Sequence, residues 1–169
     1  MPFTASSTGV AAGSRIYLYD GTSAEIRVYS AEAALTGLWR ITGATREVTP
    51  EQHRAYLNQR ARNAVKPEYE PLLRRVYGSM DVPALAAMFQ ELTVDEAGML
   101  WARLATEDVE MRPTWVVFDT TGRALGTAIL PRDLEVHFIG SDHVLGRCRD
   151  STDVEHVCRH QLTRTTTRR

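Results

Sequence analysis

The sequence predicts a mainly β fold of about three antiparallel, four-stranded units, the third of them incomplete, with a helical arm inserted after the first. Three observations lead to this prediction. Short runs of alternating apolar and polar residues are bounded by turn-forming residues, as strands require. One pattern of such runs recurs along the chain, and between its first two copies the hydrophobic period changes from that of a strand to that of a helix.

The first copy of the pattern occupies residues 8–41. Residues 15–19 and 25–29 alternate in polarity, and Asp20-Gly21 between them is a hairpin turn signal. Residues 35–41 form a further apolar run. We therefore expect a meander of antiparallel strands here.

The second half of the second copy aligns with the first copy without a gap. Its strands and turns are expected at residues 92–98, 99–103, 114–118, 119–122 and 124–130, ended by Pro131. When residues 26–30 are laid on residues 115–119, Gly37 falls on Gly126 and Ile41 on Leu130. This agreement in register is the main support for a repeat.

The third copy is shorter than the other two. Its strands are expected at residues 135–139, 144–148 and 154–158, with a turn at 140–142 and with no obvious fourth strand. Leu162 is the last hydrophobic residue, and residues 163–169 are only threonine and arginine. We expect a domain over residues 1–162 followed by a disordered tail.

Residues 42–88 have a helical period, so we interpret them as a helical insertion in that domain. Thr49 and Gln52 have the spacing of a capping box, and Pro50 occupies the first helical position, where its missing N–H costs nothing. The helix that follows has an apolar stripe of Leu57, Ala61, Ala64 and Val65, with Arg54, Asn58, Gln59 and Arg62 facing away.

A second, shorter helix is expected over residues 69–77, between Pro67 and Gly78. Its apolar face consists of Tyr69, Leu72, Leu73 and Val76. We expect Leu57, Ala61 and Leu72 to pack against β structure or against each other. A separate small domain is the weaker interpretation, because the apolar stripe is narrow and needs another surface to cover it.

The composition excludes several classes of protein. The 169 residues are 43% hydrophobic with a formal net charge of -1, which gives no overall field for nucleic acid. No stretch approaches the roughly 18 apolar residues of a spanning helix. The residues after Met1 lack the charged and apolar regions of a secretory signal, so the chain as it stands is expected in the cytoplasm, or outside it if the native gene is longer.

Cys148 and Cys158 are the only cysteines, too few for a disulfide framework, and they lack a second pair with which to make a zinc site. If their segments form a hairpin that turns near Ser151 and Thr152, Cys148 lies opposite about position 155. A disulfide is therefore not expected, although a bulge of one or two residues would change that.

Three segments carry a resemblance to a known family. Residues 94–101, 115–123 and 154–157 resemble the repeats of bacterial six-bladed β-propellers, broadly the NHL-repeat and TolB-like group, and the likeness covers residues 1–41 and 82–162. The resemblance implies a partial β-propeller, equivalent to the C-terminal half of a ring, in which Trp101, Trp115 and Phe118 pack between blades. It implies little about activity.

Such a half-ring would have open ends. Three blades would leave unpaired strand edges and uncovered faces, both of which favour aggregation. Either the chain is a truncated product or something else supplies the missing half. A homodimer with two-fold symmetry would complete six blades.

No nucleotide-binding glycine loop, paired metal motif or nucleophile elbow occurs, so we assign no catalytic, cofactor-binding or metal-binding residue and no cofactor. The strongest chemical cluster consists of His137, Asp142, His143, Asp150, Asp153, His156 and His160. Neighbouring strand residues point to opposite faces, so this set is not expected to converge on one ion.

Two classes of function follow. We favour a non-catalytic binding or scaffold protein for an unidentified protein, peptide or carbohydrate, held by exposed loops such as that containing Glu107, Asp108 and Glu110. The alternative is a propeller enzyme, a metal-assisted lyase or hydrolase that uses the C-terminal His/Asp cluster.

Overall fold

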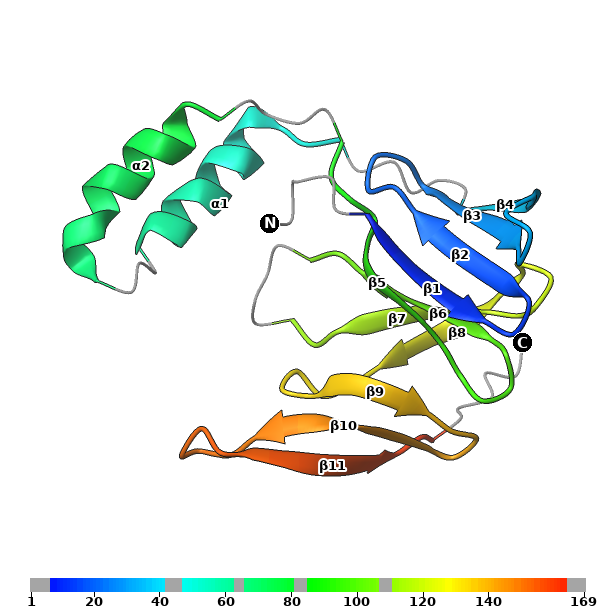
Figure 1. Cartoon of the computed structure of the whole chain (residues 1–169). Coiled ribbons are helices and arrows are strands. Elements are labelled where there is room, and N and C mark those ends of the chain that lie inside the picture. Colours follow the sequence, from blue (N-terminus) through cyan, green and yellow to red (C-terminus); the bar gives the residue numbers. More distant parts are fainter. Residues whose placement is uncertain (1–6, 42–46, 63–65, 81–84, 107–110, 164–169) are drawn as a thin grey trace, which may run out of the picture.

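The computed structural model describes residues 7–41, 47–62, 66–80, 85–106 and 111–163. They form eleven strands in three antiparallel sheets and two α-helices, which confirms the mainly β prediction (Figure 1). Sheet 1 contains β1 (Thr8–Ala12), β2 (Arg15–Tyr19), β3 (Glu25–Ser30) and β4 (Leu35–Arg40). Sheet 2 contains β5 (Phe89–Val94), β6 (Leu100–Leu104), β7 (Thr114–Phe118) and β8 (Ala124–Ile129). Sheet 3 contains β9 (Glu135–Ile139), β10 (His143–Arg149) and β11 (Glu155–Gln161).

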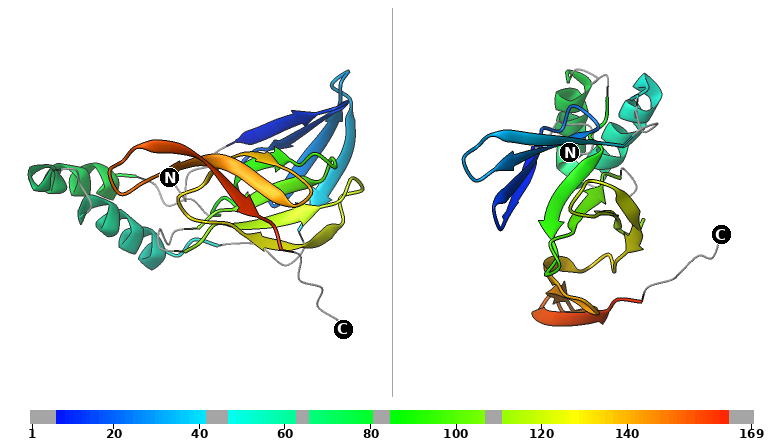
Figure 2. Two further views of the ribbon diagram at one scale, coloured as in Figure 1. Left: turned by 90° about the horizontal axis from the view of Figure 1, so that it is seen from below. Right: turned by 90° about the vertical axis from the view of Figure 1, so that its right-hand side faces the viewer.

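The three sheets stack face to face, with sheet 2 in the middle (Figures 1 and 2). The core between sheets 1 and 2 includes Tyr17, Tyr19, Ile26, Phe89, Leu100 and Phe118. The core between sheets 2 and 3 includes Trp101, Trp115, Leu134, Ile139, Val144 and Cys148. Two separate apolar layers therefore hold the stack together, and the burial of their large side chains is the main stabilising term.

Each sheet is a simple meander in which consecutive strands are neighbours. In the described part of the chain, sheet 3 has three strands where sheets 1 and 2 have four, as the sequence predicts. Strands that are paired within a sheet are therefore close together in the sequence. The helical arm separates β4 of sheet 1 from β5 of sheet 2.

The hairpins β3–β4 and β7–β8 correspond position for position. Glu25 pairs with Arg40 in sheet 1, and Thr114 pairs with Ile129 at the aligned positions of sheet 2. Both ladders also shift register at the same point, after Val28 in one and after Val117 in the other. The gapless alignment drawn from the sequence therefore holds between these two hairpins.

Several hairpin turns share one mechanism, in which an aspartate caps its own turn. Asp119 Oδ1 accepts hydrogen bonds from the backbone N–H groups of Thr121 and Arg123 at 2.8 and 3.0 Å. Asp95 accepts equivalent bonds from Ala97 and Met99, and Asp150 from Thr152 and Val154. The residue three positions after each aspartate has a positive φ; these residues are Gly98, Gly122 and Asp153. Turn chemistry thus fixes where these strands end.

The helical arm consists of α1 (Pro50–Arg62), a short 3-10 turn (Pro67–Tyr69) and α2 (Glu70–Gly78). The predicted capping box is present: Gln52 N–H donates to Thr49 Oγ1 at 3.2 Å, and Thr49 N–H donates to Gln52 Oε1 at 3.0 Å. Figures 1 and 2 show the two helices side by side and extending away from the sheets. Neither helix of the described chain is long and apolar enough to cross a membrane.

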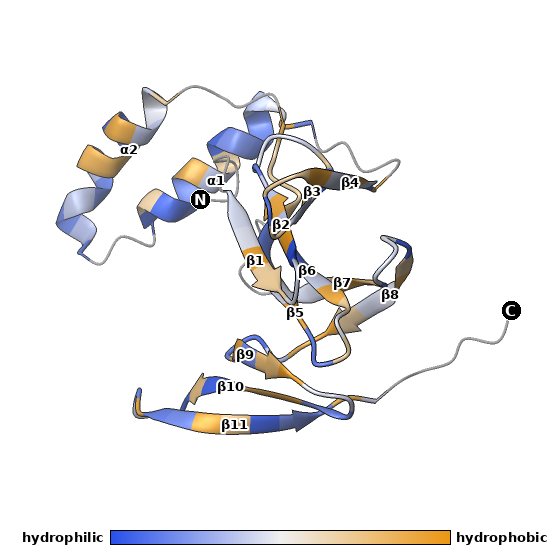
Figure 3. Ribbon diagram, turned by 45° about the vertical axis from the view of Figure 1, so that its right-hand side comes forward, coloured by the Kyte–Doolittle hydropathy of each residue, from blue (hydrophilic) through white to orange (hydrophobic). Residues whose placement is uncertain are grey.

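The packing of the arm differs in part from the prediction. Ala61 is buried and Leu57 is half-buried as expected, but the buried face of α1 also includes His53 and Tyr56. Ala64 and Val65 lie outside the described residues. The expectation for Leu72 is wrong. In α2, whose ribbon has apolar turns (orange in Figure 3), Leu72 is 55% exposed, and the half-buried residues are Glu70, Leu73 and Tyr77.

Candidate functional site

Each sheet has two faces, which we name by their place in the stack. The leading face points in the direction from sheet 1 to sheet 3, and the trailing face points the opposite way. The leading face of sheet 1 packs on the trailing face of sheet 2, and the leading face of sheet 2 packs on the trailing face of sheet 3. Within the described residues, no sheet covers the trailing face of sheet 1 or the leading face of sheet 3.

The leading face of sheet 3 exposes a position that is buried in the other two sheets. The equivalent cross-strand pairs are Tyr19 with Ile26, Arg103 with Trp115, and Arg147 with Val157. Ile26 and Trp115 are each 1% exposed, because the next sheet covers them. Val157 is 86% exposed. Sheet 3 therefore presents a packing surface without the sheet that this surface meets elsewhere in the chain.

The trailing face of sheet 1 also exposes apolar side chains at positions that another sheet covers in sheet 2. Leu18 pairs with Arg27 where Ala102 pairs with Val116 in sheet 2. Ala102 is fully buried by sheet 1, whereas Leu18 is 45% exposed. Leu35 and Leu38 of β4 are also exposed and pair with strand β3 on this side. Large apolar side chains in this number on one sheet face are a mark of an interaction surface.

A cavity of about 360 Å³ lies between sheets 2 and 3. Its lining includes Asp95, Trp101, Gly126, Ala128, Gly140 and Leu162. A pocket of about 340 Å³ occupies the corresponding place between sheets 1 and 2. Its lining residues Val28, Gly37 and Trp39 are the counterparts of Val117, Gly126 and Ala128.

Asp95 is the acidic group of this cavity, and its hydrogen bonds are already satisfied. Its Oδ2 accepts a bond from Trp101 Nε1 at 3.0 Å, and its Oδ1 accepts two bonds from the turn that it caps. The carboxylate therefore positions Trp101 and the turn. These contacts give it a structural role in the chain as it stands.

The predicted His/Asp cluster is divided between the two ends of β10. At one end His143 Nδ1 lies 2.6 Å from Asp142 Oδ1, and at the other His156 Nε2 lies 2.9 Å from Asp150 Oδ2. The strand between them has seven residues, which corresponds to roughly 20 Å. His137 instead lies 3.7 Å from Glu135, and Asp153 pairs with Arg149. The set does not converge, as the alternation of strand side chains predicts.

Both His/Asp pairs lower the pKa of the aspartate. The hydrogen bond from His143 holds the pKa of Asp142 below its ordinary value, and the hydrogen bond from His156 does the same for the pKa of Asp150. Glu91 of β5 behaves differently, because burial raises its pKa while Arg103 at 3.3 Å opposes that rise.

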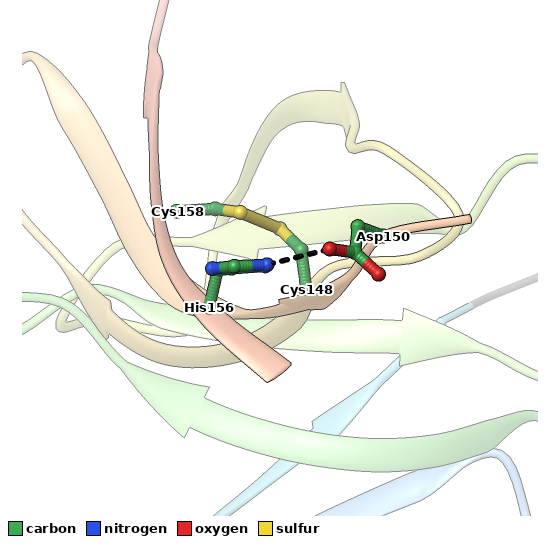
Figure 4. Close-up of a disulfide and its surroundings, with 4 residues drawn as sticks. All are labelled: Cys148, Asp150, His156 and Cys158. Carbon is green, nitrogen blue, oxygen red and sulfur yellow. Dashed lines mark hydrogen bonds and ion pairs between the residues drawn. A yellow bond between two sulfur atoms is a disulfide. The ribbon is translucent and has the colours of Figure 1, made fainter. Parts of the chain in front are cut away.

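The expectation that Cys148 and Cys158 are not bonded is wrong. Cys148 lies opposite His156, one position further along β11 than the sequence suggested. Cys158 is the next residue on the same face as His156, and its Cα lies 5.9 Å from that of Cys148, so the two form a disulfide across the diagonal (Figure 4). The spacing in the sequence indicates only which residues lie directly opposite each other, whereas this disulfide joins diagonal neighbours.

His160 completes a group that sequence reasoning did not single out. The sulfur atoms of Cys148 and Cys158 and a ring nitrogen of His160 all lie within 4.8 Å of one another. His156 lies outside this group, because one of its ring nitrogens faces Asp150 (Figure 4). The alternation of residues 158 and 160 along one strand is the signal that could have identified the set.

Some predicted features lie outside the described residues. They are the loop residues Glu107, Asp108 and Glu110, and residues 164–169 of the tail. No known protein family matches the chain, and no curated protein matches its sequence.

Proposed function

We propose that this chain is a non-catalytic binding or scaffold protein, built as half of a six-bladed β-propeller, and that a second copy of the chain supplies the other half. The observation that carries the proposal is the exposure of Val157 at a position where Ile26 and Trp115 are buried by the next sheet. Each sheet then represents one blade, and sheet 3 is the blade that lacks its outer strand.

The two uncovered faces are of complementary type. In each pair of neighbouring sheets within the chain, a leading face meets a trailing face, and the chain exposes one of each. In a dimer with two-fold symmetry, the leading face of sheet 3 in each copy can therefore pack on the trailing face of sheet 1 in the other copy, which gives two equivalent interfaces. Six stacked sheets would result, without an uncovered face.

Charged groups on the two faces are already paired within their own sheets. On sheet 3, Arg147 is held between Glu135 and Glu155, so that its charge is balanced beside Val157. On sheet 1, Arg27 pairs with Asp20 beside Leu18. Ion pairs around an apolar centre are the usual arrangement of a protein interface.

The proposed binding function depends on the loops and pockets that a six-bladed assembly would contain. Its turns and loops would form the surfaces of the ring, where binding residues are commonly placed because loops vary without disturbing the sheets. The cavity beside Trp101 would provide an apolar pocket between two blades. We propose a protein, peptide or carbohydrate as the ligand class.

The enzyme alternative has less support. A metal-assisted lyase or hydrolase needs several ligands around one open coordination position, and the His/Asp pairs lie at opposite ends of β10.

Light scattering on a size-exclusion column tests the assembly. The wild-type chain should elute as a dimer, and Val157→Arg should elute as a monomer with an unchanged circular dichroism spectrum and melting temperature. Leu72→Arg is the matched control, because it places the same charge at another exposed apolar residue and should remain dimeric. A stable wild-type monomer would overturn the proposal. Heterogeneous aggregates would also overturn it, in favour of further blades in the same polypeptide.

A further inference from the structure

We propose that the reduced chain binds one zinc ion through Cys148, Cys158 and His160, and that oxidation to the disulfide releases the ion. The site lies on the trailing face of sheet 3, and it is independent of the assembly proposed above.

The three side chains come from two paired strands and share one face. Cys148 is at the end of β10, and Cys158 and His160 alternate along β11, so all three point toward sheet 2. Their ligand atoms lie within 4.8 Å of one another. Tetrahedral ligands at about 2.3 Å for sulfur and about 2.0 Å for nitrogen lie roughly 3.5 to 3.8 Å from one another, so reduction has to release the bonded sulfur atoms before the three groups can surround the ion.

Cys148 is buried, and Cys158 and His160 are half-buried. Cys148 and Cys158 adjoin the apolar core between sheets 2 and 3. The site is therefore shielded on one side and reached by solvent on the other. This position allows an ion and a redox reagent to enter while the surrounding sheet fixes the ligands.

The equivalent positions in sheet 2 show that packing does not require these residue types. The cross-strand pair of Val144 and His160 in sheet 3 occupies the same position as the pair of Leu100 and Phe118 in sheet 2. In this register Cys158 takes the place of Val116, and His160 takes the place of the buried Phe118. Two thiols and an imidazole thus stand where an otherwise similar sheet uses apolar side chains.

His160 is available as a ligand. Its imidazole has no hydrogen-bond or ion-pair partner among the residues that the structure describes. His156, on the same strand and face, is instead held by Asp150. Three protein ligands leave the fourth tetrahedral position of zinc to a water molecule.

The chemistry of the two states balances. Zinc binding to the reduced chain releases one proton from each thiol, because thiolates are the ligands. Hydrogen peroxide oxidises the two thiolates by two electrons to one sulfur–sulfur bond. It takes up those electrons and two protons from solvent to give two molecules of water, and the ion is released. A phosphine reductant with one water reverses the oxidation, giving two thiols and the phosphine oxide.

Zinc analysis of the untagged full chain tests the site. The chain is reduced with a phosphine under anaerobic conditions, incubated with zinc chloride, desalted, and measured by atomic spectroscopy. We expect one zinc per reduced chain and none per chain oxidised with peroxide. Cobalt(II) in place of zinc should give a thiolate-to-cobalt charge-transfer band that oxidation abolishes.

Two histidine variants separate this site from other zinc binding. His160→Ala should weaken zinc binding by at least roughly tenfold, since a direct ligand is lost. His156→Ala is the matched control and should change the affinity by less than about twofold. Circular dichroism of the reduced variants shows whether each has folded, and Cys158→Ser provides a second ligand variant.

The absence of zinc from the reduced wild-type chain would overturn the proposal. So would zinc binding that persists in His160→Ala, or that is equally strong in the oxidised chain. None of these results would alter the oligomeric state of the oxidised chain, so failure of the zinc site and failure of the proposed function are distinguishable.

Discussion

The indole of Trp39 in sheet 1 lies directly over Gly122 in the β7–β8 turn of sheet 2. A Cβ atom on Gly122 would come within 2.5 Å of this indole, closer than carbon atoms can approach. Trp39 also contacts Phe118, so one side chain of an outer strand fixes the spacing of two sheets at their turns.

Gly122→Ala should destabilise the protein by about 2–4 kcal/mol. The residue has a φ of +90, which disfavours any L side chain, and the new methyl group also displaces Trp39. Chemical denaturation measures the free energy of unfolding. Gly13→Ala is the control: its φ is also positive, at +57, but no atom lies near the new Cβ, so it should cost only about 1 kcal/mol. An equal decrease in the free energy of unfolding for the two variants would show that the indole of Trp39 moves aside without destabilising the protein.

Ala33→Gly should stabilise the protein by about 0.5–1 kcal/mol. Ala33 ends the β3–β4 turn with a φ of 61, a conformation that glycine adopts without strain. Asp153, with a φ of 63, is the second such residue, and Asp153→Gly should give a smaller gain because aspartate tolerates this region better. Its exposed ion pair with Arg149 contributes little. A lower midpoint of denaturation for Ala33→Gly would contradict the turn argument.

Trp115→Ala should cost about 3–5 kcal/mol and largely abolish soluble protein, because its side chain fills the core between sheets 2 and 3. Leu72→Ala, which removes an exposed side chain from α2, should cost less than about 0.5 kcal/mol. Soluble yield and thermal melting compare the two. A well-folded Trp115→Ala protein that had lost only binding would instead make Trp115 a ligand contact.

The chain should lose stability in acid. The backbone N–H of Thr22 lowers the pKa of Asp20, and the hydroxyl of Thr121 lowers the pKa of Asp119. A carboxyl whose folded pKa is depressed contributes stability that is present above its unfolded pKa of about 3.9 and is lost as the pH falls toward the folded pKa. The melting temperature should therefore decline below about pH 4. Asp119→Asn should show a smaller decline over the same range, and an identical decline would rule out this residue as a contributor.

The turns and alternating strands could be predicted because their causes are local. Asp119 and Gly122 mark a hairpin wherever it lies, and the capping box of Thr49 and Gln52 marks a helix start in the same way. The disulfide of Cys148 could not be predicted, because its geometry depends on a one-position difference in pairing. The exposure of Leu72 depends on which side of α2 meets α1, and an apolar stripe alone does not decide that.

Among the residues that the structure describes, a bridge between Glu47 and Leu85 joins the two ends of the helical arm. Beyond this bridge the returning chain is anchored to the sheets, where Met88 N–H donates to the hydroxyl of Tyr19 and Ala105 N–H donates to the carbonyl of Met88. The arm is therefore a side branch whose two ends meet at this bridge, and no described residue of its helices belongs to either sheet core. Its amide hydrogens should exchange with deuterium through a local opening that leaves the sheets protected. The same feature makes the segment replaceable, so that a short reverse turn grafted between these two residues would yield a smaller protein with the sheets intact.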